Sequence, residues 1–260
     1  MRAVVVSLTD LGRSARMQYH ARALAATGCD VDFVGLEGTP LPQSLGAHAR
    51  VFVHRLRAAE LRASTAAGVG YSAAAVIDGI RTGFRLWRVL RRLPPPDLVL
   101  VRNPPAFPTL LVTRFALRRA PVRLVVDWHD VGYTALQRRL GRWHPAVRFS
   151  RWLERHEVRR SETHLCVSKG LAAFLTTRFG VMSAHVLYDR PAAAFRFLES
   201  HRREQFRQAF FGRLGVYSAA ALVVCPSSWT EHEDFDVVID AVQDLEEKIR
   251  VWESGGTGRR

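Results

Sequence analysis

A carboxylate and an imidazole stand two positions apart where an apolar run of the sequence ends. Asp127 and His129 close the predicted strand 124–129, and alternate residues of a strand point to the same face of its sheet. We therefore expect the two side chains to converge on one ligand. An aspartate beside a histidine fixes the tautomer of the imidazole and raises its basicity, which suits a general base. The alternative is a strand-end histidine that is hydrogen-bonded to the backbone.

The N-terminal loop holds a second group of candidates, suited to binding an anion. The apolar run 3–8 leads into a loop that carries Gly12, Arg13, Ser14 and Arg16. A strand that passes through a glycine-containing turn into a helix directs backbone amides and the positive end of the helix dipole at a phosphate. The arginines add charge-assisted hydrogen bonds, although the spacing is not G-x-G-x-x-G. A tight turn with exposed arginines is the alternative.

Further polar side chains follow other predicted strands. Asn103 comes directly after one strand, and its amide can both donate to and accept from a sugar hydroxyl. The segment 188–191, Tyr-Asp-Arg-Pro, is interpreted as a structural clasp at a domain hinge. Ser227, Ser228 and Thr230 follow a later strand, where hydroxyls either bind a phosphate at a helix start or cap that helix.

These side chains need a scaffold that brings strand ends together, and the hydrophobic pattern predicts one. Short apolar runs alternate with helical patterns, which is typical of an α/β protein with a parallel sheet covered by helices. Ligands bind at the carboxyl edge of such a sheet. The first helix is predicted between strands one and two, with Ser14 as its N-cap and its end near Gly28. The predicted strands are Val4–Leu8, Val31–Leu36, Val51–Leu56, Leu98–Arg102, Leu124–His129, His164–Ser168 and His185–Tyr188.

The sequence predicts one complete domain and the start of another. Residues 1–195 form the Rossmann-like domain, and 196–220, which are charged and lack a strand pattern, form an interdomain segment. A strand at Leu222–Cys225 and a helix at 235–245 then begin a second α/β unit in residues 221–260. One strand and one helix cannot close a domain, so the second domain is expected to be truncated.

Composition favours a basic globular protein. The net charge is +14 at pH 7, and all basic residues except Lys169 and Lys248 are arginine. Such a surface favours phosphates, anionic lipid head groups or nucleic acid, but no nucleic-acid recognition motif is present, so we expect no nucleic-acid partner. Cys29, Cys166 and Cys225 lie in apolar runs without metal or redox spacing, which predicts buried thiols in a reducing compartment.

No stretch of the sequence reaches the roughly 18–20 apolar residues that span a bilayer, and the N-terminus lacks the pattern of a signal peptide. The chain is therefore expected to be soluble or peripheral. A long helix over residues 73–93, ended by prolines 94–96, carries a flank of arginines. That flank either lies against anionic head groups or is a solvated helix face. Its members are Arg81, Arg85, Arg88, Arg91 and Arg92.

Five motifs, taken in order and spacing, resemble the chitobiosyldiphosphodolichol β-mannosyltransferase family. They are LGRSARMQYH at 11–20, NPP at 103–105, DWH at 127–129, LYDRPA at 187–192 and SSWTEHEDF at 227–235. The resemblance covers residue 1 to about residue 245. It implies a GT-B fold, in which two Rossmann-like domains face each other across a cleft. The N-terminal domain would receive the lipid-linked acceptor, and the C-terminal domain would hold GDP-mannose.

The resemblance also implies a reaction and its participants. Mannose would pass from GDP-mannose, with inversion, in β-1,4 linkage to dolichol-pyrophosphate-linked chitobiose during assembly of the N-glycan precursor. No metal or cofactor is implied, because helix dipoles and basic side chains can stabilise the leaving diphosphate. The implied location is the cytosolic face of the endoplasmic reticulum membrane, with the membrane surface and other dolichol-pathway glycosyltransferases as partners. The residues assigned are Asp127 and His129 for acceptor orientation and base catalysis, Gly12, Arg13, Ser14, Arg16 and Asn103 for the acceptor and its phosphates, and Ser227, Ser228 and Thr230 for the donor.

The chain departs from the family pattern at several points. Ala15 stands where proline is usual, and Asp130 stands where asparagine is usual. The membrane-spanning helix that usually opens family members has no counterpart, and neither does most of the donor domain. We therefore expect the chain alone to bind GDP-mannose poorly and to be a weak or inactive enzyme. The alternative is a non-catalytic module that binds lipid pyrophosphates or associates with glycosyltransferase partners.

Overall fold

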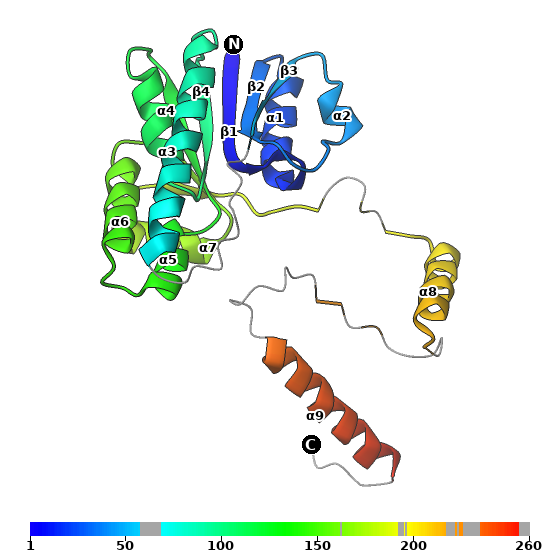
Figure 1. Ribbon diagram of the computed structural model, residues 1–260. Helices are drawn as coiled ribbons and strands as arrows, with labels where there is room; N and C mark the ends of the chain where they lie inside the picture. The colour runs from blue at the N-terminus through cyan, green and yellow to red at the C-terminus, as the bar shows by residue number, and fades with distance from the viewer. Residues whose placement is uncertain are drawn as a thin grey trace. The chain divides into compact units, whose positions relative to one another are not determined.

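The computed structural model (Figure 1) describes residues 1–57, 69–161, 163–191, 195, 197–216, 222, 224, 225 and 235–254, with the backbone alone for 69–75. The chain divides into two compact units, Met1–Phe195 and Arg196–Arg260. Within the described residues, every strand belongs to the first unit.

The first unit is built on a seven-stranded parallel sheet whose strand order is β3-β2-β1-β4-β5-β6-β7. All seven predicted strands are confirmed, within a few residues at their ends. From β1 the chain adds β2 and β3 on one side and β4 to β7 on the other, so the direction in which strands are added reverses between β1 and β4. In α/β sheets, ligands bind in the crevice beside such a switch point. The strands are β1 (Arg2–Asp10), β2 (Asp30–Leu36), β3 (Val51–Leu56), β4 (Leu98–Asn103), β5 (Arg123–Trp128), β6 (Thr163–Cys166) and β7 (Ala184–Val186).

Helices connect the strands and cover both faces of the sheet, as Figure 1 shows for α3 and α4 in front of the strands. The first helix ends close to Gly28, whose φ of 89° is a left-handed conformation that favours glycine. The helix with the arginine flank ends at Arg92, before the prolines. The elements are the 3-10 turn η1 (Leu11–Arg13), α1 (Ala15–Ala26), α2 (Gln43–Gly46), α3 (Val69–Arg92), α4 (Thr109–Leu117), α5 (Gly132–Leu140), α6 (Pro145–Val158), α7 (Lys169–Phe174) and the π-helical turn η2 (Leu175–Phe179).

Two hydrophobic cores lie on the two faces of the sheet. Alternate residues of β1 supply them: Val4 and Val6 belong to the core under α3 to α6, and Ala3 and Val5 belong to the core under α1. Because both faces are buried, the strand reads as a continuous apolar run rather than an alternating one. The face of the sheet to which a residue points therefore depends on its parity, that is, on whether it stands at an odd or an even position of the strand.

The second unit differs from the expectation. Residues 196–220 were expected to be irregular, yet α8 (Ser200–Leu214) lies within them, and nearly all of its side chains are exposed. Leu222, Val224 and Cys225 are not in a strand, so the predicted strand 222–225 is not found in its described residues. Cys225 is exposed, whereas Cys29 and Cys166 are buried as expected. The predicted helix at 235–245 is α9 (Phe235–Glu253).

Candidate active site at the carboxyl edge

Polar residues form the last row of the sheet on the face that α1 covers. The core on that face includes Leu100 of β4 and Val125 of β5, and two positions later each strand carries a charged residue. These residues, Arg102 and Asp127, are paired in register across β4 and β5. In β1, Ser7 follows Ala3 and Val5 on the same face by the alternation of the strand. The site is thus the end of an apolar face, at the switch point between β1 and β4.

Asp127 is the centre of this site. Its carboxylate is fully buried and accepts two hydrogen bonds from Arg16, from Nε at 2.7 Å and from Nη2 at 2.8 Å. The Nε2 atom of His20 lies 3.0 Å from Oδ2 of the same carboxylate. Arg16 and His20 are four residues apart and therefore share one face of α1. Through these two side chains α1 is held against the carboxyl end of β5.

The charges around Asp127 keep it ionised. Burial alone would raise its pKa, but His129, His20 and Arg16 outweigh burial and hold the pKa far below its ordinary value. A carboxylate with so low a pKa is a permanent anion near neutral pH, which makes it a weak proton acceptor. Asp127 is therefore suited to positioning its neighbours Arg16, His20 and His129 and not to accepting a proton.

His129 lies beside Asp127, as the alternation of the strand predicts. Its Nε2 atom is 3.4 Å from Oδ2 of Asp127 and has no hydrogen-bond partner among the described residues. Its backbone amide donates to the carbonyl of Asn103 at 2.9 Å, which anchors the residue at the sheet edge. The side chain is 15% exposed, so the imidazole is held by its neighbours and is still reachable from solvent.

Arg102 is a partly buried cation without a carboxylate partner in the described chain. Its Nη1 donates to the hydroxyls of Thr9 at 3.0 Å and Ser14 at 3.1 Å, and its Nε is buried without a partner. Burial lowers the pKa of Arg102, although Asp127 and Asp189 raise it. An arginine that donates hydrogen bonds only to hydroxyls, and has a free Nε, can still receive an anion. Sequence reasoning did not select it, although its position two residues after Leu100 placed it on the face of Asp127.

The N-terminal loop is organised differently from a phosphate-binding glycine loop. The amide of Gly12 donates to Oδ1 of Asp10 at 2.9 Å, so that amide is already engaged. A Cβ on Gly12 would lie 2.2 Å from the carbonyl oxygen of Thr39, which explains the glycine by close packing. Ser14 occupies the N-cap position of α1, but its hydroxyl bonds Ser7 and Arg102 instead of capping the helix. Arg13 is exposed at the edge, whereas Arg16 is buried against Asp127.

Asn103 points to the opposite face of the sheet from Arg102 and Asp127. Its side chain is fully buried, and Nδ2 donates to Oε1 of Glu154 at 3.2 Å. Glu154, on α6, also accepts from the amide of Gly132 at 2.7 Å and thereby holds the first turn of α5. In the structure the Asn103 amide faces Glu154, so the expected contact with a sugar hydroxyl stays a prediction. The parity of β4 accounts for the difference, since adjacent strand residues face opposite ways.

The segment after β7 is fastened to α1. Arg16 donates through Nη1 to the carbonyl of Leu187 at 2.5 Å and to Asp189 at 3.1 Å. The hydroxyl of Tyr19 donates to the carbonyl of Pro191 at 2.7 Å. These contacts fit the clasp that was expected of residues 188–191. They also show that Arg16 is fully committed to protein partners, which leaves Arg13 and Arg102 for a ligand.

Two residues near the site were not predicted from the sequence, and three predicted residues lie outside the part of the chain that the structure describes. His20 was missed, although its spacing of four from Arg16 indicated a shared helix face. Glu154 was missed because no local pattern connects it with residue 103. The proposed donor residues Ser227, Ser228 and Thr230 lie outside the described residues. Among the residues that the structure describes, no group of three or more His, Cys, Asp or Glu could hold a metal ion.

The buried Glu154 leads to a prediction about pH. Burial raises its pKa to about 7, even though Asn103 and the amides of Gly132 and Tyr133 oppose the shift. Because the raised pKa means that the folded state binds the proton more tightly, unfolding free energy falls as pH rises from about 4.3 to 7. Glu154→Gln, which resembles the protonated acid, should raise the unfolding free energy at pH 8 by about 2 kcal/mol. The gain should shrink towards pH 5.

Urea unfolding of both proteins at pH 5 and pH 8 measures this effect. Glu157→Gln is the matched control, because Glu157 lies one turn away on α6, is equally buried and is paired with Arg114. That variant should be destabilised at both pH values, since it leaves a charged partner without its carboxylate. A gain for Glu154→Gln that is the same at both pH values would contradict the assignment.

Comparisons of the sequence with known proteins identify a family and several relatives. The glycosyl transferase 4-like domain family matches residues 12–191. The chain is 32% identical to the UDP-glycosyltransferase TURAN of Arabidopsis thaliana, over 98% of this chain and 62% of that protein. It is also similar to the chitobiosyldiphosphodolichol beta-mannosyltransferases of Yarrowia lipolytica (31% identity, 93% of this chain, 52% of that protein) and Mus musculus (30%, 96% and 57%). The chain thus spans between about half and about three-fifths of the length of these relatives.

Solved structures show the same architecture. The sucrose-phosphate synthase of Thermosynechococcus elongatus superposes with a TM-score of 0.54 at 15% sequence identity, over 79% of this chain and 52% of that chain. The glycosyltransferase TcCGT1 in complex with UDP superposes with a TM-score of 0.50 at 10% identity, over 80% and 55%. At such identities the likeness concerns the fold alone. It confirms the predicted α/β fold class of the GT-B type.

Proposed function

This chain belongs to the glycosyl transferase 4-like domain family, and from that premise we propose that it provides the acceptor domain of a mannosyltransferase. The proposed reaction transfers mannose from GDP-mannose in β-1,4 linkage to chitobiose linked to dolichol pyrophosphate. The names of the beta-mannosyltransferase relatives support the reaction. The structural observation that supports it most is that Arg102, which has no acidic hydrogen-bond partner, lies in register with Asp127, and that His129 lies beside Asp127.

The acceptor pyrophosphate is proposed to bind at Arg102 and Arg13. Arg102 has no acidic partner among the described residues, and Arg13 is exposed on the turn before α1. The amino end of α1 begins at the same place, and its dipole favours a negative charge there. The first turn of α1 contains no acidic residue that would repel a phosphate. One helix terminus and two guanidinium groups can together neutralise much of a diphosphate charge.

His129 is proposed as the general base. With its proton on Nε2, in the field of the Asp127 carboxylate, the ring keeps the lone pair of Nδ1 for the 4-hydroxyl of the acceptor. The acceptor oxygen forms a bond to C1 of mannose while the bond from C1 to the phosphate oxygen breaks. GDP departs with that electron pair, the hydroxyl proton moves to His129, and the configuration at C1 inverts. The negative Asp127 then stabilises the imidazolium that forms.

The location and partners follow from the acceptor. A dolichol-linked substrate places the enzyme at a membrane, and we propose the cytosolic face of the endoplasmic reticulum, with other dolichol-pathway glycosyltransferases as partners. In the described part of the chain, no helix has both the length and the apolar composition needed to cross a bilayer. The membrane surface is therefore the contact that this part of the protein makes in the proposal.

The test is mannose transfer to phytanyl-pyrophosphoryl chitobiose in detergent, with GDP-mannose and UDP-glucose offered separately. It is run with this 260-residue chain and with the longest product that its gene encodes. We expect the longer product to transfer mannose from GDP-mannose and not from UDP-glucose, and a β-mannosidase to release the transferred sugar. This chain by itself should transfer weakly or not at all. Transfer from UDP-glucose instead would overturn the proposed donor. Binding of the acceptor without transfer by either protein would favour a non-catalytic module.

His129→Gln examines the base. Loss of a positioned general base lowers turnover by about 10²–10⁴-fold, so kcat should fall by that factor while the affinity for the acceptor stays close to wild type. His144→Gln is the matched control, because His144 caps the start of α6 and takes no part in the site. A His129→Gln protein with unchanged kcat would remove His129 from this role.

A further inference from the structure

An open apolar groove runs between α3 and α4, on the sheet face opposite the Arg102–Asp127 row. Its volume is about 570 Å³, which lies in the range of ligand-binding pockets, about 300–1,000 Å³. Gly83 permits the close approach of the two helices, since a Cβ there would lie 2.9 Å from Cβ of Pro108. The side chains that line the groove include Ile80, Phe84, Trp87, Phe107, Leu111 and Phe115.

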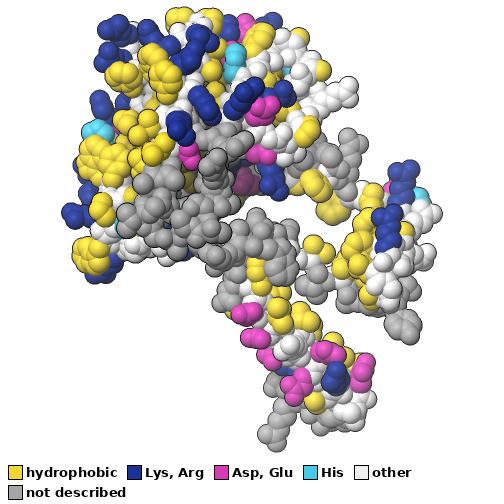
Figure 2. Space-filling model, in the orientation of Figure 1, with side chains coloured by type: hydrophobic (Ala, Val, Ile, Leu, Met, Phe, Trp, Pro, Cys, Tyr) yellow, Lys and Arg dark blue, Asp and Glu magenta, His cyan; other side chains and the backbone are white. Residues whose placement is uncertain are grey.

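The lining is unusually exposed for side chains of this size. Ile80 is 58% exposed, Phe84 is 56% exposed and Phe115 is 54% exposed. A contiguous apolar surface is generally a site of interaction with another molecule. In Figure 2 the hydrophobic side chains of this part of the molecule, in yellow, are interleaved with dark blue arginines. The mixture of apolar and cationic side chains restricts what can cover it.

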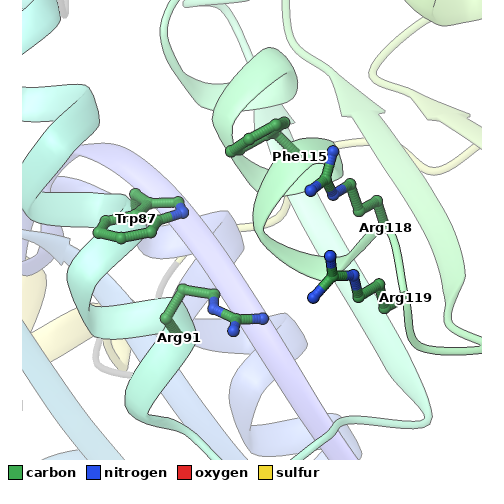
Figure 3. A pocket seen from close by; sticks show the side chains of 5 residues that line it. All are labelled: Trp87, Arg91, Phe115, Arg118 and Arg119. Carbon is green, nitrogen blue, oxygen red and sulfur yellow. The ribbon is translucent and has the colours of Figure 1, made fainter.

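Arginines gather at one end of the groove. A second hollow adjoins it there, lined by Arg91 from α3, by Arg118 and Arg119 after α4, and by Trp87 and Phe115, which both hollows share (Figure 3). Arg118 stacks over the ring of Phe115, 4.6 Å from its centroid. Among the described residues, none of these three arginines has an acidic partner. Three cations at the end of an apolar groove match an anionic head group attached to a hydrocarbon chain.

We propose that this surface, the α3–α4 face, docks on a membrane that contains anionic phospholipid. The acyl chain of one lipid lies in the groove, and its phosphate is bound by Arg91, Arg118 and Arg119. Helices with apolar and basic side chains on one face bind membranes in this way, through buried apolar area and attraction to anionic lipids. The charge complementarity selects this occupant over an apolar protein partner, which would leave the arginines unpaired.

The order of the elements along the chain indicates which end of the groove lies near the candidate active site and which end holds the arginines. α4 begins after the carboxyl end of β4, so Phe107 and Pro108 lie near the edge that holds the candidate active site. Arg91 lies at the end of α3, just before the chain enters β4, and therefore belongs to the opposite edge. The docked face would run the length of the domain. This inference stands without the proposed reaction, because it concerns a surface that contains none of the residues of the site.

Vesicle flotation tests the proposal with the full chain and with no acceptor or donor present. We expect binding to vesicles of phosphatidylcholine and phosphatidylserine in equal parts, and much weaker binding to phosphatidylcholine alone. Since each arginine near an anionic surface contributes about 1 kcal/mol, Arg118→Gln with Arg119→Gln should lower the partition coefficient about 30-fold. The matched control is Arg202→Gln with Arg203→Gln, an adjacent exposed pair on α8. An equal loss in this control would show that net charge alone attracts the chain and would overturn the proposal.

The apolar half of the proposal has its own variants. Phe84→Gln with Phe115→Gln alters two exposed side chains and should abolish flotation while circular dichroism stays unchanged. The control is Phe52→Gln, on β3, whose ring is 45% exposed. Flotation that survives the Phe84 and Phe115 changes would overturn the groove as the docking site. A dimer in sedimentation equilibrium that these changes dissolve would instead identify a second copy of this chain as the occupant, and would also overturn it.

Fluorescence reports whether a lipid chain enters the groove. Trp87 lines it, so phosphatidylserine vesicles with brominated acyl chains should quench part of the tryptophan emission. That part should disappear in Trp87→Phe. It should remain in Trp252→Phe, which removes an exposed tryptophan of α9. Quenching that is the same in wild type and in Trp87→Phe would contradict insertion at this site, whatever the outcome of the mannose-transfer assay.

Discussion

Asp127→Asn is expected to lower the unfolding free energy by about 3–5 kcal/mol, because removing one partner of a buried ion pair leaves the other charge uncompensated. Arg16 is 7% exposed and would keep its charge without the carboxylate that accepts the hydrogen bonds of its Nε and Nη2. A domain has only about 5–15 kcal/mol of stability in total. The variant should therefore unfold at a clearly lower urea concentration than wild type.

The measurement is urea unfolding followed by circular dichroism, with Asp189→Asn as the control. Asp189 also contacts Arg16, at 3.1 Å, but its carboxylate is 60% exposed. Screened ion pairs contribute about 0–1 kcal/mol, so the control should unfold almost as wild type does. Equal effects of the two changes would show that burial of the Asp127–Arg16 pair has little bearing on stability.

The pH dependence of the same pair has a definite sign. Burial opposes ionisation of Asp127, but the neighbouring His129, His20 and Arg16 depress its pKa far below the ordinary value. A depressed carboxyl pKa contributes stability above the unfolded-state value, about 3.9 for aspartate, and that stability is lost as pH falls through the folded value. The difference between wild type and Asp127→Asn should therefore be constant from pH 5 to pH 8 and shrink only under strongly acidic conditions.

Arg102→Met is expected to weaken acceptor binding about 100-fold, while the fold stays as stable as wild type or becomes more stable. A hydrogen-bonded charge pair with a ligand is worth about 2–5 kcal/mol when one partner is removed, which covers this factor. The unliganded fold, in contrast, has a partly buried guanidinium that meets only the hydroxyls of Thr9 and Ser14. Replacing a partly buried cation that has no hydrogen-bonded carboxylate by an apolar side chain of similar length relieves its desolvation.

Isothermal titration with phytanyl-pyrophosphoryl chitobiose and thermal unfolding without ligand measure the two halves of this prediction. Arg123→Met is the matched control, since Arg123 begins β5, at the other end of the sheet, and is exposed. It removes the same charge and should leave acceptor affinity near wild type. Unchanged affinity in Arg102→Met would contradict the phosphate site, and an equal loss in Arg123→Met would reduce it to a non-specific effect of charge.

The comparison of Arg102 with Asn103 shows where sequence reasoning and structure separate. Both follow the same predicted strand, and the sequence analysis selected the asparagine for its hydrogen-bonding versatility. In the structure Asn103 is fully buried against Glu154, and Arg102 lies on the other face of the sheet, against the Thr9 hydroxyl. The alternation of side chains along β4 predicts that Arg102 and Asn103 point to opposite faces, because Leu98, Leu100 and Arg102 share one face. A reading that followed parity instead of residue chemistry would have selected the arginine.

The parallel sheet, and the shared face of Asp127 and His129, follow from local patterns in the amino-acid sequence. Continuous apolar strands between amphipathic helices, and a period of two within β5, depend only on neighbouring residues. Only the tertiary structure decided which partners Asp127 has. Arg16 and His20 are more than a hundred positions away, and Glu154 reaches Asn103 across 51 positions. Such contacts arise when helices pack on the sheet, and packing distances between remote segments leave no local periodicity in the chain.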